Sequence, residues 1–240
     1  GSMVAVLSDQ NGYFDINILD AMTGEKIKKL IKGNRGVDFE ELKWLQPGLS
    51  WSPDSKKIVF AAKAGKGDVL HVVEVETGKG EKYELDIEGV FSASWSPLGN
   101  EIAYVGQSGN SSDIYIFDLN SQISKKITND IFSDSYPTWS GDGKNIAFVS
   151  DRGNEISGAY DGFMYEHDYS QTDIYSINVE TKKIDRVTNT NHNESHPVWS
   201  KTSDNIFYTS DHNGVWNLYR HPISESEDSE PIPVTNVLTG

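Results

Sequence analysis

The sequence predicts an all-β protein, a β-propeller built from four-stranded antiparallel blades. Three observations predict this fold class: a tryptophan phrase recurs four times within 240 residues, a second landmark follows each copy, and short apolar runs alternate with turns rich in glycine, proline and aspartate. Self-similarity with a period of about 40–50 residues and four short strands per repeat is typical of propeller blades.

The recurring phrase contains Trp51, Trp95, Trp139 and Trp199. Its four copies read LSWSPDSKKIVFAA, ASWSPLGNEIAYVG, PTWSGDGKNIAFVS and PVWSKTSDNIFYTS. In each copy the tryptophan belongs to a first strand, and a type I turn leads into a second, apolar strand, with glycine or serine where the turn favours a left-handed residue. The tryptophans are 44, 44 and 60 residues apart, which indicates one insertion in an otherwise regular array.

A second landmark opens the third strand of each repeat, as in DIYIFDLN and DIYSINVE. The landmark residues are Asp68, Asp113, Asp173 and Asn217. The fourth strand ends in a pair such as Ile127-Thr128 or Val187-Thr188. We therefore expect one propeller domain over residues 1–240, with blades at 3–32 (partial), 45–86, 90–129, 134–189 and 194–236, and the insertion at 153–171.

The array is expected to comprise four full blades and one partial blade. The first residues align with strands two to four of a repeat, with Asp15 as the landmark, and the tryptophan due after Thr235 is not reached before Gly240. A part of a larger propeller explains this arrangement most simply, and a five-bladed ring closed by one short blade is the alternative. Open blade edges would allow self-association by strand pairing.

The composition limits the partners. With 21 basic and 36 acidic residues the net charge is −15, which argues against nucleic acid and anionic membranes because both require basic patches. The chain has no cysteine, which excludes disulfides and thiolate chemistry. Neither an apolar run long enough to span a membrane nor a signal peptide is evident, so no membrane insertion is expected.

The phrase PTWSGDGKNIAFVS, followed by DIYSINVE and a closing Val-Thr, resembles the TolB-type (WD40-like) β-propeller repeat. The resemblance covers nearly the whole chain and departs from the family pattern at Leu98 and at residues 201–203, where the Pro-Asp-Gly turn is replaced. It implies a bacterial protein with a periplasmic or other extracytoplasmic setting, protein partners, and a propeller that is not catalytic by itself.

The loops that enter the first strands are the first candidate site. In two successive repeats a carboxylate stands five residues before the tryptophan, and an aromatic or imidazole group stands three residues before it. These tentative rim residues are Gln46, Asp134, Tyr136, Glu194 and His196. Such a rim could hold a cationic ligand, a metal or a protein partner, and the alternative is an ordinary solvated loop.

The insertion is the second candidate site, because the repeat does not require it. Its candidate residues are Asp161, Tyr165, Glu166, His167 and Asp168. Their oxygen ligands could bind calcium, although the spacing does not match the twelve-residue calcium loop. Its aromatic residues could equally anchor a protein partner, and an ordinary excursion packed on the blade is the third interpretation.

Signals for an enzyme are weak. His192 and His196 could form a metal pair, but no clear third ligand accompanies them, and no nucleophile motif is present. We therefore expect no catalytic residues and no cofactor other than a possible calcium ion. The leading hypothesis is a non-enzymatic binding or scaffolding propeller. The alternative is a propeller-type polysaccharide lyase or hydrolase, or an accessory domain of a peptidase, that uses the channel rim.

Overall fold

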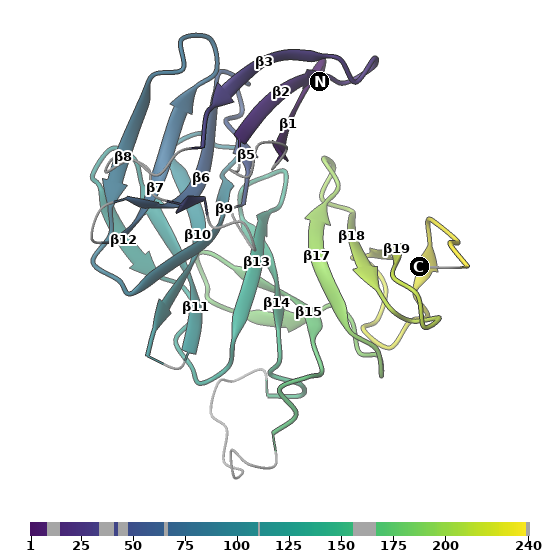
Figure 1. The fold of residues 1–240 in the computed structure, drawn as a ribbon. Coiled ribbons are helices and arrows are strands. Elements are labelled where there is room, and N and C mark those ends of the chain that lie inside the picture. The colour runs from purple at the N-terminus through teal and green to yellow at the C-terminus, as the bar shows by residue number, and fades with distance from the viewer. Residues whose placement is uncertain are drawn as a thin grey trace.

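All regular elements in the described part of the chain are β-strands, and they form five antiparallel sheets (Figure 1). The computed structural model describes residues 1–8, 15–33, 41–42, 48–64, 67–109, 111–155 and 167–238. Nothing in these ranges forms a helix of the length and hydrophobicity that a membrane crossing requires.

Each sheet is one blade. In chain order the blades contain β1 (Met3–Ser8), β2 (Asp15–Asp20) and β3 (Lys26–Ile31); β4 (Glu41–Leu42), β5 (Ser50–Trp51), β6 (Lys57–Ala64), β7 (Gly67–Glu74) and β8 (Gly80–Glu84); β9 (Gly89–Trp95), β10 (Glu101–Ser108), β11 (Ser111–Asp118) and β12 (Ile123–Lys126); β13 (Asp134–Trp139), β14 (Asn145–Ser150), β15 (Asp173–Asn178) and β16 (Ile184–Arg186); and β17 (Glu194–Trp199), β18 (Asn205–Ser210), β19 (Asn217–Pro222) and β20 (Ile232–Pro233). The predicted fold class is confirmed: the first blade has three strands and the next four are complete.

The second blade differs from the other complete blades. Its innermost strand is divided, because β4 and β5 both pair with β6 on the edge that β7 does not occupy. The tryptophan phrase predicts β5, but the two-residue strand β4 comes from the connection before it and was not expected.

The core lies between blades. Four clusters of buried apolar side chains join successive sheets, and each combines the second and third strands of one blade with those of the next. Because a central sheet is covered on both faces, its second strand contains a continuous apolar run: residues 146–149 of β14 are apolar and all buried. In Figure 1 the sheets are arranged around a central axis, with β5, β9, β13 and β17 on the inner side.

The turns after the tryptophans have the predicted geometry in all four repeats. The residue at the left-handed position has a positive φ, 60° at Ser55, 96° at Gly99, 71° at Gly143 and 62° at Ser203. A backbone hydrogen bond closes every turn, including those at Leu98 and residues 201–203, where the sequence departs from the family pattern. A serine or glycine at the fourth position is therefore enough to keep the turn.

Candidate functional site

The two predicted rim carboxylates are buried at the boundaries between blades. Asp134 begins β13 and Glu194 begins β17, and both are 0% exposed. They occupy equivalent places, since Asp134 pairs with Ser150 and Glu194 with Ser210 at the same end of their sheets. Gln46 lies outside the described residues. Asp134 and Glu194 therefore face the preceding blade rather than solvent.

Asp134 belongs to an ionic cluster between the third and fourth blades. The buried Arg152 guanidinium donates to Asp134 Oδ1 at 2.7 Å and to Asp130 Oδ2 at 3.0 Å. Lys126 pairs with the landmark Asp113 at 2.8 Å. Burial raises the pKa of Asp134 to about 6, although the positive charge of Arg152 opposes the shift.

The Arg152 side chain is held in an aromatic cage. Its guanidinium carbon lies 5.5, 5.2 and 5.5 Å from the ring centroids of Phe132, Phe148 and Tyr175. These rings come from the connection before the fourth blade and from its second and third strands. Cation–π contacts of this kind stabilise a desolvated guanidinium. Arg152 is thus a structural cation, and the sequence pattern gave no indication of it.

Among the described residues, no cationic side chain pairs with Glu194. Its Oε1 accepts hydrogen bonds from the hydroxyls of Thr190 (2.6 Å) and Ser210 (3.4 Å), and its Oε2 accepts one from Thr188 (3.3 Å). The carboxyl group also interacts with that of the landmark Asp173 in the preceding blade. Burial, together with the charge of Asp173, raises the pKa of Glu194 to about 8.

The landmark aspartates and the closing threonines form a repeated network. Thr128 and Thr188 each accept a hydrogen bond from the backbone amide that follows the landmark, at 2.9 Å in both repeats. In the second blade Asp68 instead accepts from the amide of Val90, the first-strand residue of the next blade. These contacts explain why the repeat needs Asp and Thr at fixed positions: they connect the third and fourth strands to the next blade.

Tyr136 and His196 are the rim residues that remain accessible. Their ring centroids are 4.2 Å apart, with the planes inclined by 40°. Each lies in a β-bulge of its innermost strand with a positive φ, 51° at Tyr136 and 52° at His196. Tyr136 is half-buried and His196 is exposed, and partial burial lowers the pKa of His196. A neutral imidazole on a tyrosine ring offers a stacking surface rather than a charged one.

The insertion is described only at its two ends. Asp161, Tyr165 and Glu166 lie outside the described residues. His167 Nε2 lies 3.5 Å from Asp151 Oδ2, and its ring packs against Phe132 (5.3 Å) and the edge of Tyr169 (4.6 Å). Asp168 is exposed and accepts hydrogen bonds from the amide and hydroxyl of Ser170. His167 thus joins the end of the insertion to the loop that precedes the fourth blade.

Within the described residues, one group of side chains has metal-ligating composition and proximity. It consists of Asp113, Asp130 and Asp134. Each of these three carboxylates already pairs with Lys126 or Arg152, so a metal cation would have to displace a paired side chain. His192 does not pair with His196; its ring lies 4.7 Å from that of His212.

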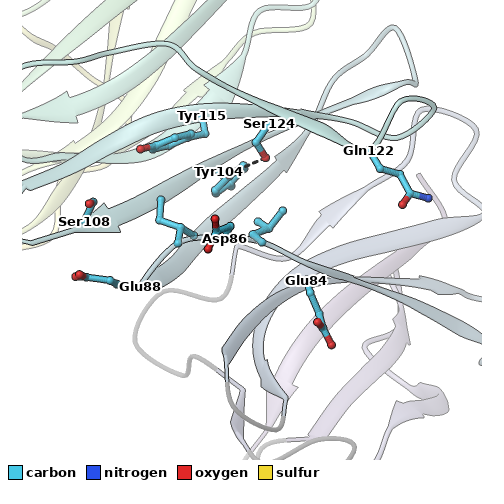
Figure 2. A pocket seen from close by; sticks show the side chains of 10 residues that line it. Glu84, Asp86, Glu88, Tyr104, Ser108, Tyr115, Gln122 and Ser124 are labelled. Atoms are coloured by element: carbon cyan, nitrogen blue, oxygen red, sulfur yellow. Dashed lines mark hydrogen bonds between the residues drawn. The ribbon is translucent and has the colours of Figure 1, made fainter.

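Of the cavities in the described part of the chain, two adjoin the ends of the insertion and the third blade, respectively. One of about 510 Å³ lies where the ends of the insertion, including His167 and Asp168, meet Arg186 and residues 189–191. The larger, of about 810 Å³, lies beneath residues 84–88 (Figure 2). In it Tyr104 and Tyr115 stack at 5.3 Å, and the Tyr104 hydroxyl donates to Ser124.

The larger cavity was not predicted from the sequence. The only signal is the alternation in Glu84-Leu-Asp-Ile-Glu88, where the carboxylates are exposed and the two apolar residues pack on the third blade. Alternation of this kind also occurs in any half-buried strand, so it does not by itself indicate a cavity.

The fold and these boundaries define the class of protein: a β-propeller whose blades are joined by buried polar networks. The family model described as TolB beta propeller domain matches residues 40–157, so this part of the chain carries TolB-type propeller repeats and the resemblance inferred from the sequence is confirmed. A comparison with curated protein sequences gave no match.

Solved structures support the same fold. TolB from Acinetobacter baumannii matches with a TM-score of 0.72 and 20% identity over 93% of this chain and 50% of that chain. A putative TolB from Agrobacterium tumefaciens matches with a TM-score of 0.70 and 19% identity, over 100% of this chain and 73% of that chain. A prolyl endopeptidase matches with a TM-score of 0.58 and 16% identity, over 98% of this chain and 36% of that chain. This chain therefore spans about half the length of the Acinetobacter protein, and at these identities the likeness concerns the fold.

Proposed function

We propose that the chain is a non-catalytic protein-binding propeller that belongs to a larger extracytoplasmic bacterial protein. The observation that carries the proposal is the Tyr136–His196 pair, two rings in contact, with centroids 4.2 Å apart and planes inclined by 40°, on the innermost strands of adjacent blades. Accessible aromatic rings on rigid strands suit protein interfaces, where they supply contact area at low entropic cost. The TolB-type repeats support the extracytoplasmic setting and a protein partner.

The alternative, a lyase or hydrolase that uses the rim, requires Asp134, Glu194 and His196 to reach a substrate together. Asp134 and Glu194 are fully buried and hydrogen-bonded within the protein, and only His196 is exposed. A general acid or base must come within hydrogen-bond distance of the reacting group. The geometry therefore favours binding over catalysis at this rim.

The binding proposal is tested with envelope extract from the source bacterium and immobilised chain. A Tyr136→Ser/His196→Ser double variant should lose at least about tenfold in partner capture, because both stacking surfaces are removed. Leu98→Ser, which removes an exposed apolar side chain from the turn at the other end of the innermost strands, serves as the control and should capture as the wild type does. Equal capture by the double variant, or cleavage of polysaccharide by the wild type that the double variant lacks, would contradict the proposal.

We further propose that the insertion extends this binding surface. His167 connects the end of the insertion to Phe132, in the loop before the fourth blade, and to Asp151, directly after β14. Replacing residues 156–166 with a short glycine-serine linker should weaken capture of the same partner and leave the thermal unfolding midpoint within a few degrees of the wild type. Undiminished capture would restrict the site to the rim.

A further inference from the structure

Two boundaries between blades are built on the same plan but differ at two charged positions: Arg152 and Asp130, which pair at the first, are replaced by His212 and Thr190 at the second. Between the third and fourth blades Asp113 faces Asp134, and between the fourth and fifth blades Asp173 faces Glu194. In both cases the landmark pairs with a cation from the fourth strand of its own blade: Lys126 at 2.8 Å, and Arg186 at 2.6 Å. One charge of each buried carboxyl pair is therefore compensated in the same way.

The second cation is present at only one boundary. Asp151 and Asp211 occupy equivalent places, since each accepts a backbone hydrogen bond at 2.9 Å from the loop before its blade. The next residue is Arg152 in the fourth blade and His212 in the fifth. Arg152 pairs with Asp134 at 2.7 Å. Across the described residues, no ion pair joins Glu194 to His212 or to any other cationic side chain.

Each boundary contains a buried acceptor without a hydrogen-bond donor in the described structure: Asp134 Oδ2 at the first, and an oxygen of the landmark itself at the second. Asp173 is 0% exposed; its Oδ2 binds Arg186, while its Oδ1 has no hydrogen-bond donor in the described structure. The Glu194 carboxyl is the group that faces it, and a carboxylate cannot donate. With a proton on Glu194, the pair has one donor and one acceptor, and together with Arg186 it carries no net charge.

We propose that a proton shared by Asp173 and Glu194 closes the boundary between the fourth and fifth blades, and that its loss as the pH rises loosens the fifth blade. Without the proton two buried carboxylates would face each other with only Arg186 in compensation, and an uncompensated buried charge is strongly destabilising. The raised pKa of Glu194, about 8, agrees with this arrangement.

The other groups around Glu194 do not supply the missing charge. Asp173 and Arg186 face it from the fourth blade, and Tyr208 faces it from β18. Burial raises the pKa of Tyr208 well above its ordinary value, so this phenol stays neutral. His212 occupies the position that arginine has at the other boundary, and its ring packs on those of Tyr219 and His192.

Hydrogen exchange of the whole chain, followed segment by segment between pH 6.5 and 9, tests the proposal. After correction for the intrinsic rise of amide exchange with pH, the amides of β17–β19 should exchange up to about tenfold faster per pH unit until about pH 8 and level off above it, because each opening then releases a proton. The amides of β13–β15 should show no such rise, since the pKa of Asp134 is about 6.

Three variants separate this proton from other causes. Glu194→Gln, whose amide can donate to Asp173, should abolish the additional rise in β17–β19. His212→Arg, which installs the cation of the other boundary in a similar ring environment, should remove the additional rise between pH 6.5 and 9. Glu225→Gln changes an exposed carboxylate of the same blade and should behave as the wild type. The proposal is wrong if β17–β19 and β13–β15 respond alike in the wild type, or if Glu194→Gln or His212→Arg keeps the wild-type dependence.

Discussion

Arg152 is the single residue on which the boundary between the third and fourth blades depends most. Its guanidinium and the carboxyl of Asp134 are both 0% exposed, and it also pairs with Asp130. Replacing Arg152 with methionine would keep much of the volume but leave Asp134 as a buried charge. We expect Arg152→Met to lower the free energy of unfolding by about 3–5 kcal/mol, measured by urea denaturation at pH 7.

A matched control is available on the surface of the same blade. Lys183 and Asp185 form an ion pair at 2.6 Å, but their side chains are 72% and 56% exposed. Exposed pairs contribute little because water and salt screen them. Lys183→Met should therefore leave the urea midpoint nearly unchanged. If the two methionine variants were equally stable, Arg152 would not be compensating buried charge.

His71 makes stability depend on pH in the acid range. The side chain is 9% exposed on β7, with its ring 5.1 Å from that of Phe60. Burial, with a smaller effect from the charge of Lys82, lowers the pKa of His71 to about 4. Between pH 6.5 and 4 the unfolded chain therefore binds a proton that the folded chain does not, so this contribution is present above pH 6.5 and is lost as the pH falls towards 4.

The expected loss from His71 is at most about 3 kcal/mol between these two pH values. Other groups titrate in this range, and the raised pKa values of Asp134 and Glu194 act in the opposite direction. The comparison is therefore between wild type and His71→Phe, by urea denaturation at pH 6.5 and 4.5. The variant should lose less stability on acidification than the wild type does, and an equal loss would show that His71 is not involved.

At the scale of elements, the residue three positions before each repeat tryptophan has a left-handed backbone conformation where neighbouring blades meet. Gly48, Ser92, Tyr136 and His196 all have φ values between 50° and 61°. A Cβ at Gly48 would lie 2.1 Å from the backbone nitrogen of Ala93 in the next blade. Glycine is needed there for two reasons: the left-handed conformation and the backbone contact.

These two reasons can be separated by alanine substitution. Gly78 has a similar φ of 73°, but a Cβ there would meet nothing within 4 Å, so Gly78→Ala should cost only the conformational term of about 1–2 kcal/mol. Gly48→Ala should cost the same conformational term plus about 1–3 kcal/mol for the overlap of its Cβ with the backbone of Ser92 and Ala93. Thermal and urea unfolding of the two variants give the difference, and equal costs would mean that the blades separate freely at this point.

The sequence predicted the strands and turns because they depend on local chemistry. The tryptophan phrase, the turn residues and the alternation in each strand recur in every blade, and they specify β5–β7, β9–β12 and their equivalents. The strand β4 was missed because Glu41-Leu42 has no counterpart in the other repeats. It exists only because the adjacent edge of β6 is free to accept it.

The sequence predicted where the candidate site residues lie in each blade, but not that Asp134 and Glu194 are buried. Aligning the repeats places Asp134 and Glu194 at equivalent points, yet a polar residue before a strand looks the same whether it faces solvent or the preceding blade. Arg152 and His212 were not recognised because they follow the second strand, about 18 residues from the carboxylates along the chain, and only the sheet pairing brings them back. Residues 136 and 196 remain the accessible part of the predicted rim.

At the scale of the whole molecule, the sheets are not covered equally. The faces between successive blades are occupied by apolar clusters, whereas the other face of the fifth sheet presents Val198, which is 56% exposed, paired with the half-buried Phe207. Exposed apolar surface on a sheet favours association, while a net charge of −15 opposes it through repulsion between chains. Salt, which screens the repulsion, should therefore shift the balance.

This balance predicts reversible self-association of the chain through the fifth blade. By light scattering after gel filtration, the average mass should increase with protein concentration, and more steeply at 0.5 M than at 0.05 M salt. Val198→Glu should keep the chain at single-chain mass, because it adds charge to the apolar face. Ile123→Glu, at a residue that is 65% exposed on β12 of a blade covered on both sides, should associate as the wild type does. If the wild type has single-chain mass at every concentration and salt level, repulsion outweighs the exposed face, and this surface does not serve as a contact between copies.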